Sequence, residues 1–181
     1  AATGYLLGNV IHDIHHVGSD YNPGSAWSTG AAIIGWNNGE LHIAGNTIHD
    51  VDAGILSPGG GGQAWFIHNN IIADLAEPSY HVAVIIGEVA ARSRVTHNLL
   101  YQSGGAVRLA WGSTSVLEGV DALQAAWGDR ARANLEADPG FVDPAAGDLR
   151  LRWLSDPSPA IDTGGGLQPY VDLFANLYGL N

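Results

Sequence analysis

An asparagine returns four times in the chain within the same local pattern of residues. The segments are GNVIHDI, GNTIHDV, HNNIIAD and HNLLYQS, and the repeated residues are Asn9, Asn46, Asn69 and Asn98. The side chains three residues before each asparagine are Leu6, Ile43, Phe66 and Val95, and those two residues after it are Ile11, Ile48, Ile71 and Leu100. All eight are apolar. Self-similarity with a period of about 20–50 residues predicts structural units stacked one on the next.

Each repeat predicts a strand, a turn at the asparagine and further strands. Alternation before the asparagine indicates a strand with one buried face, and asparagine tolerates the left-handed backbone of a sharp turn. An apolar run flanked by Gly or Ala follows each asparagine, at 31–35, 53–56, 82–87 and 105–109. Identical amides in stacked units can also hydrogen-bond along the stack.

Through this N-x-[IL] turn and its apolar rows, residues 4–110 resemble the right-handed parallel β-helix superfamily, the pectate-lyase-like fold. The resemblance implies one all-β domain, with a right-handed parallel β-helix of about four coils over 1–112 and a short helix and irregular C-terminal cap over 113–181. Apolar residues at helical spacing after Ser115, a candidate N-cap, predict the helix, which Gly128 would end. The segments ADPGFVDPAAGDLRLRW and SDPSPAID resemble the C-terminal region of secreted bacterial β-helix proteins, which closes the end of the stack.

Composition narrows the functional classes. The formal net charge of −11 argues against nucleic acid, because phosphate binding needs a basic face. The absence of cysteine excludes disulfides and thiolate metal sites. No apolar run is long enough for a membrane span, and the start Ala1-Ala2-Thr3 is typical of a chain from which a signal peptide was removed. We therefore expect a secreted protein, extracellular or at the cell surface.

Aligning the first two repeats places histidines and aspartates next to one another. The candidate metal ligands are His12, Asp13, His15, His49, Asp50 and Asp52. Imidazole and carboxylate are metal ligands, and two neighbouring carboxylates favour a cation between them or a raised pKa. Ca²⁺ or another divalent metal is the possible cofactor. The alternative is that the N-x-I-H-D phrase is an ordinary turn with solvated side chains.

A second row, four residues before each asparagine, is predicted to point outward. Its members are Tyr5, His42, Trp65 and Arg94. Sugar rings pack on aromatic faces, so this row is a candidate polysaccharide-binding surface, with Trp27 and Trp36 at its border; the alternative is a stripe covered by loops. Residues 1–91 hold eight acids and no Lys or Arg, so this surface is expected to favour a neutral glycan or an acidic one bridged by a divalent metal.

Lyases of the family use an Arg or Lys base, and hydrolases use two carboxylates. The resulting catalytic candidates are His12, Asp13, His49, Asp50, Arg94 and Arg108. We therefore expect a secreted polysaccharide lyase or glycoside hydrolase. The alternatives are a non-catalytic glycan-binding, surface or self-assembling module and a metal-dependent protein. No amphipathic or polar cap precedes Tyr5, so the first coil is expected to be covered by another chain, by further sequence of a longer chain or by a further copy.

Overall fold

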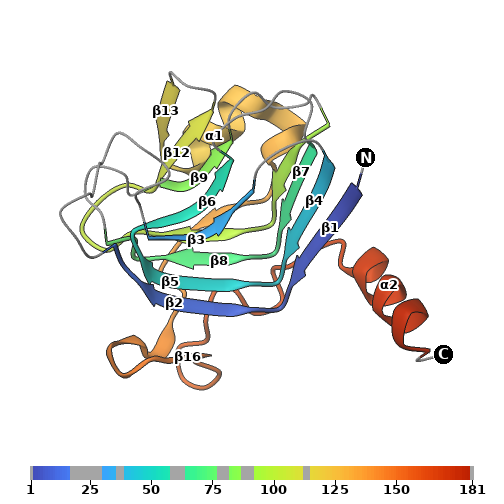
Figure 1. Cartoon of the computed structure of the whole chain (residues 1–181). Helices are drawn as coiled ribbons and strands as arrows, with labels where there is room; N and C mark the ends of the chain where they lie inside the picture. The colour runs from blue at the N-terminus through green and yellow to red at the C-terminus, as the bar shows by residue number, and fades with distance from the viewer. Residues whose placement is uncertain are drawn as a thin grey trace.

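The computed structural model describes residues 2–16, 30–35, 39–57, 64–76, 82–86, 92–111 and 115–179. Its centre consists of three sheets that the chain visits in turn, so that each strand pairs with the strand one repeat later (Figure 1). The first sheet contains β1 (Ala2–Leu7), β4 (Gly39–Ala44), β7 (Ala64–His68) and β10 (Arg94–Thr96), all parallel. The expectation of a strand-rich fold with parallel sheets is confirmed.

The second and third sheets follow the same order. The second contains β2 (Val10–Ile14), β5 (Thr47–Val51), β8 (Ile71–Ala73), β11 (Leu99–Tyr101) and β14 (Leu135–Glu136), all parallel. The third contains β3 (Ala31–Ile34), β6 (Ala53–Ser57), β9 (Val82–Ile86), β12 (Arg108–Trp111) and β13 (Ser115–Glu118), with only β13 antiparallel. The apolar run after each asparagine forms the third sheet.

A ladder of asparagines joins the repeats, but one of its members differs from the prediction. The ladder is Asn9, Asn46, Asn70, Asn98 and Asn134. Each side-chain Oδ1 after the first accepts from both the backbone N–H and the Nδ2 of the preceding ladder residue, at 2.8–3.0 Å. The sequence HNN offers two asparagines, and Asn70 rather than Asn69 enters the ladder.

The left-handed turn residue is the one before the ladder asparagine. These positions are Gly8, Gly45, Asn69, His97 and Ala133, with φ between 54° and 67°. The prediction that the repeated asparagine itself takes this conformation is therefore wrong except at Asn69, which occupies the turn and leaves the ladder to its neighbour. Glycine is favoured at such positions because it has no Cβ to clash.

Two apolar rows fill the space between the sheets. The register aligns Leu6, Ile43, Ile67 and Val95 in one row and Ile11, Ile48, Ile72 and Leu100 in the other. All of them from the second repeat onward are at most 1% exposed. The prediction was wrong at Phe66 and Ile71, because the shift from Asn69 to Asn70 displaces each row by one residue in the third repeat and so reverses the two faces of the strand.

The α1 helix (Val120–Trp127) begins after Gly119 and ends at Gly128, with Val120, Leu123 and Trp127 buried. The predicted stop at Gly128 is confirmed. Ser115 is not its N-cap, since residues 115–118 form β13. Two 3₁₀ turns (Gly128–Ala131 and Pro144–Ala146) and the hairpin of β15 (Phe141–Asp143) and β16 (Asp148–Leu151) lie in the C-terminal region.

The C-terminal segment runs back along the side of the sheets. Phe141 packs edge-on against His49 of the second repeat, with ring centroids 5.5 Å apart. Figure 1 shows β16 beside the β2 end of the sheets and the second helix, α2 (Gln168–Tyr178), beside β1. Neither this helix nor any other in the described residues has the length and apolar character of a membrane-spanning helix. The segment is thus placed where it can contribute side chains to a site on the first sheet.

Candidate functional site

A groove of about 410 Å³ lies between the first sheet and α2. Its sheet side includes Tyr5, His42, His68 and Thr96, and its helix side includes Pro169, Tyr170 and Leu173. His97, Arg132, Gly165 and Gly166 complete the lining. A concave site with a few converging polar groups is the usual form of a ligand site.

Two members of the outward row of the first sheet, Tyr5 and His42, line this groove, and the row differs from the prediction at one position. Tyr5 aligns with His42, His42 with Phe66, and Phe66 with Arg94. Trp65 is therefore not an outward residue. It is 1% exposed, and its backbone N–H donates to Ser93 Oγ at 3.0 Å. Its ring packs against Gly35, where an added Cβ would come within 2.3 Å of it.

The aromatic rings of this row stack on one another. The centroids of Tyr5 and His42 are 4.9 Å apart with planes inclined by 20°, and those of His42 and Phe66 are 4.7 Å apart at 13°. Both faces of the His42 ring are thus covered. The row therefore presents ring edges to the groove, and a sugar can stack only at its Tyr5 end, where Tyr5 is 45% exposed.

A hydrogen-bonded chain crosses from the sheet to the helix through His42. Its Nε2 lies 3.0 Å from Glu40 Oε1 and its Nδ1 lies 3.0 Å from the Tyr170 hydroxyl. Because the carboxylate only accepts, Nε2–H donates to it, and in the neutral imidazole Nδ1 then accepts from Tyr170. The bond from His42 lowers the pKa of Glu40, whereas burial, with the negative charge of Glu40 among the smaller causes, raises the pKa of Tyr170. Tyr170 is accordingly a proton donor in the groove.

His68 is held neutral at the floor of the groove. Burial, together with the positive charges of His42, His97 and Arg94, lowers the pKa of His68 from 6.5 to about 4. Its Nδ1 lies 2.6 Å from the Thr96 hydroxyl. A titratable side chain perturbed in this way inside a groove is typical of a functional site, although structural pairs also produce such shifts.

The asparagine that is absent from the ladder fixes the far wall of the groove. Asn69 Nδ2 donates to the carbonyl of Gly165 at 2.7 Å, and Gly165 N–H donates to Asn69 Oδ1 at 2.8 Å. A Cβ on Gly165 would come within 2.6 Å of His97 Nε2, so only glycine fits there without displacement. Asn69 thus attaches the segment before α2 to the sheets.

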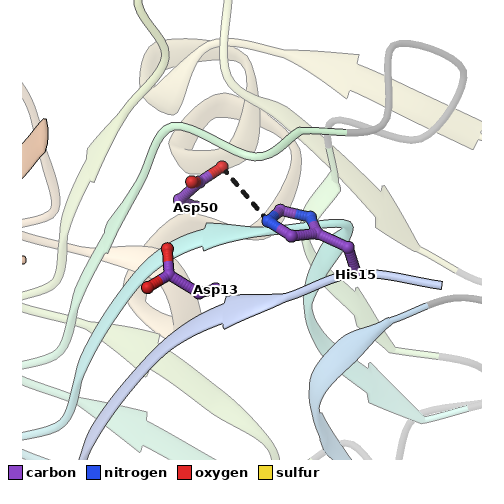
Figure 2. Close-up of side chains that lie close together, drawn as sticks. All are labelled: Asp13, His15 and Asp50. Atoms are coloured by element: carbon purple, nitrogen blue, oxygen red, sulfur yellow. Dashed lines mark ion pairs between the residues drawn. The ribbon is translucent and has the colours of Figure 1, made fainter. Parts of the chain in front are cut away.

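The predicted metal patch is only partly assembled (Figure 2). Ligand atoms of Asp13, His15 and Asp50 lie within 4.8 Å of one another, and His15 Nε2 is 3.7 Å from Asp50 Oδ1. His15 Nδ1 donates to Asp52 Oδ1 at 3.2 Å, so in the neutral ring Nε2 carries a lone pair that faces the two carboxylates. A proton or a cation between these three groups would relieve the repulsion.

The other predicted ligands have other roles. His12 Nδ1 lies 2.7 Å from Asp13 Oδ2, and this hydrogen bond lowers the pKa of Asp13. His49 Nε2 lies 3.8 Å from Asp74 Oδ2. Asp52 Oδ2 accepts from the backbone N–H groups of His16 at 2.6 Å and Gly30 at 2.9 Å, which stand on either side of residues 17–29 in the sequence. Burial raises the pKa of Asp52, but these bonds outweigh it and leave that pKa lowered.

The two predicted catalytic arginines do not meet. Arg94 belongs to β10 in the first sheet, where its Nη1 donates to Ser93 O at 2.9 Å. Arg108 belongs to β12 in the third sheet, where its Nε is 3.9 Å from Glu118 Oε1. Since they lie on different sheets, they do not share one site.

Sequence reasoning missed the helix side of the groove. Pro169 in the first turn and Gly179 after the last turn bound the α2 helix, and this Pro-to-Gly arrangement is the signal that could have predicted it. The contribution of Tyr170 was not visible, because 128 residues separate it from His42. Trp27 and Trp36 lie outside the described residues.

We compared the chain with protein-family models, with curated protein sequences and with solved structures, and none of the three comparisons gave a match.

Proposed function

We propose that this chain is a secreted carbohydrate-binding protein of the right-handed parallel β-helix type, with its glycan in the groove between the first sheet and α2. The groove carries the proposal: in about 410 Å³ it combines an exposed aromatic ring at Tyr5 with the Tyr170 hydroxyl oxygen, which donates to His42 and can still accept from a sugar hydroxyl. Apolar surface with a few oriented polar groups is the usual composition of a sugar site.

The β-helix assignment is supported by the order in which the chain visits its sheets. Three parallel sheets grow by one strand per repeat, and the asparagine ladder links consecutive repeats. Crossovers between parallel strands are right-handed in nearly all proteins. The proposed secretion rests on the resemblance of the C-terminal segment to that of secreted bacterial β-helix proteins.

Binding is favoured over glycoside hydrolysis. Hydrolysis requires two carboxyl groups flanking the bond. The described residues that line the groove include no carboxylic acid, and Glu40 is engaged by His42 and by Arg92, whose Nη1 lies 3.2 Å from Glu40 Oε2.

The test is a glycan panel on the wild-type protein, Tyr5→Ala and Tyr5→Phe. Removal of the exposed ring is expected to weaken binding roughly two- to tenfold, as loss of an aromatic contact worth about 0.5–1.5 kcal/mol would do, and Tyr5→Phe is expected to retain it. Circular dichroism of both variants serves as the check that they fold. Absence of binding to any glycan by the wild type, or equal binding by Tyr5→Ala, would contradict a glycan site in this groove.

A second candidate function, binding of a divalent cation, is favoured by the orientation of His15. A carboxylate that fixes the other nitrogen of a histidine is a common feature of metal sites, and Asp52 holds His15 in this way. Calorimetric titration with Zn²⁺ and Ca²⁺ should give binding that is lost in Asp50→Asn and kept in the control Asp156→Asn, whose side chain is 82% exposed. Equal affinity of these two variants for the metal would mean that Asp13, His15 and Asp50 form an ordinary turn with solvated side chains and no metal site.

Self-association at the β1–β2–β3 end is the third part of the proposal. These strands have a partner on one side only among the described residues, and Val10 in β2 is 62% exposed. Unpaired strand edges are templates for another chain. Sedimentation should show a dimer that Val10→Lys dissociates, and a wild-type monomer at high concentration would refute it.

A further inference from the structure

A second cavity, of about 560 Å³, lies between the outer face of the second sheet and the C-terminal segment. It adjoins the groove, since His97, Gly165 and Gly166 line both, but its floor belongs to a different sheet. Ligand cavities usually have volumes of roughly 300–1,000 Å³. The cavity is therefore large enough for a small molecule, and neither the glycan nor the cation of the proposed functions occupies it.

The floor of this cavity is apolar. It contains Ile71 in β8 and Leu99 in β11, which are partners in the register of the second sheet. Their neighbours Ile72 and Leu100 are at most 1% exposed inside the stack, so Ile71 and Leu99 point to the outer face. The middle of this outer face thus presents apolar surface that gains free energy when it is removed from water.

The C-terminal segment covers this floor without filling the space above it. Leu99 is only 3% exposed although it points outward, whereas Val10 and Leu135 at the two ends of the same row are 62% and 36% exposed. The apolar residues that the C-terminal segment adds to the lining are Leu151, Ala160 and Leu167. Apolar walls on both sides of an open space can bury an apolar molecule between them.

A single carboxylate gives the cavity its chemical preference. Asp162 is the one acid among the described residues that line it, and within the described part of the chain no ion pair or hydrogen bond engages its side chain. One carboxylate is too few for Ca²⁺, which takes six to eight oxygen ligands. It does match one ammonium group, with which it forms charge-assisted hydrogen bonds.

We infer that this cavity binds a small primary amine with an apolar body. The ammonium group lies against Asp162, and the apolar body lies between Ile71 of the sheet and Leu151 of the C-terminal segment. The net charge of −11 adds a general attraction for a cation. The inference does not depend on the proposed glycan site, because none of these three residues lines the groove.

The experiment compares 2-phenylethylamine with 2-phenylethanol, which share the ring and the two-carbon chain and differ in the ammonium group. Affinity is measured by calorimetry at pH 8, where an alkylamine is protonated. The proteins are the wild type, Asp162→Asn and the control Asp129→Asn, which removes an exposed acid that does not line the cavity. Asparagine tolerates the left-handed backbone of position 162, where φ is 60°, so the first variant should keep its fold.

The wild type should bind the amine about tenfold or more tighter than the alcohol, as expected for hydrogen bonds to a charged group. Asp162→Asn should remove that preference while changing affinity for the alcohol less than about twofold, and Asp129→Asn should change neither. In a series from butylamine to hexylamine, each methylene should raise the affinity of the wild type by up to about fourfold. Amide shifts caused by the amine should centre on Ile71 and Leu99.

Three results would overturn the inference. They are equal binding of amine and alcohol by the wild type, equal loss of amine affinity in the two variants, and amide shifts centred on Tyr5 and Tyr170, which would place the amine in the groove. The comparison of the two ligands on the wild type needs no variant, so it decides the matter even if Asp162→Asn does not fold. Loss of glycan binding in Tyr5→Ala has no bearing on the amine, so the two sites can fail separately.

Discussion

The side chain of Asn70 illustrates how much one residue contributes to this stack. Its Oδ1 accepts both the N–H and the Nδ2 of Asn46, and its own Nδ2 donates to Ile43 O at 2.9 Å. Asn69, one position earlier, has a left-handed backbone and holds Gly165 from outside. Two chemically identical neighbours thus have unrelated roles, because one side chain points into the stack and the other away from it.

We therefore expect Asn70→Ala to cost about 2–5 kcal/mol of unfolding free energy, since it leaves buried donors of Asn46 without an acceptor. The matched change, Asn69→Gly, keeps the left-handed turn and should cost clearly less while loosening the C-terminal segment. Urea unfolding of the two variants measures the difference. Equal losses would mean that the ladder does not pass through Asn70.

His68 makes stability depend on pH. Its pKa falls from 6.5 in the unfolded chain to about 4 in the fold, so between these values the unfolded state binds more protons. The stability present above pH 6.5 should therefore decrease as the pH falls toward 4, by at most about 3 kcal/mol from this group, and not further below it. Thermal unfolding of wild type and His68→Gln between pH 7 and 4 tests this, since the variant should lose most of the dependence. An unchanged pH profile in the variant would assign the effect to other groups.

Among the structural elements, α2 is the one whose place the sequence did not reveal. Its caps are visible as Pro169 and Gly179, but its contact with the first sheet joins segments more than a hundred residues apart. Propensity and spacing report local structure, whereas this contact depends on the close approach of Gly164 to Asn69 and of Gly165 to His97. The strands could be predicted because each one pairs with the equivalent strand of the next repeat. The sequence repeat that predicts a strand therefore also predicts its partner.

Gly165→Ala tests this attachment. Its Cβ would come within 2.6 Å of His97 Nε2, so we expect the segment 163–179 to detach while the sheets remain folded. Hydrogen exchange should rise in that segment and glycan affinity should fall, with Gly104→Ala as a control at a left-handed glycine that has no neighbour within 4 Å of an added Cβ. Protection retained in 163–179 would contradict the assignment of Gly165 as the fixing point.

In the whole molecule, the sheets share one interior. Ile43, Ile48 and Ile67 are all 0% exposed and belong to one apolar cluster that spans the repeats. The sequence predicted this interior correctly at six of eight positions. It failed at Phe66 and Ile71 because each is followed by another apolar residue, Ile67 and Ile72, so the pattern could not show which of the two points inward. The same slip placed Trp65 outside, so one ambiguous dipeptide altered the predicted core and the predicted site together.

Because the interior is shared, Ile48→Ala should destabilise every repeat. A loss of about 2–5 kcal/mol is expected from the cavity, in a single unfolding transition seen equally by fluorescence and circular dichroism. Val116→Ala, an exposed position in β13, is the control and should change stability little. Two separate transitions in Ile48→Ala would show that the repeats unfold independently.

The asparagine ladder also has a direction. The amides of Asn9, Asn46, Asn70 and Asn98 each donate to Oδ1 of the next ladder asparagine, so these four amide dipoles share one sense and polarise one another, as peptide dipoles do along a helix. The oxygen of Asn9 stands at one terminus with no donor among the described residues. The stack consequently has an electrically negative pole at its β1–β2–β3 end, where an N–H donor or a cation would be drawn in, whereas at the opposite pole the Asn134 amide donates to the Val95 carbonyl.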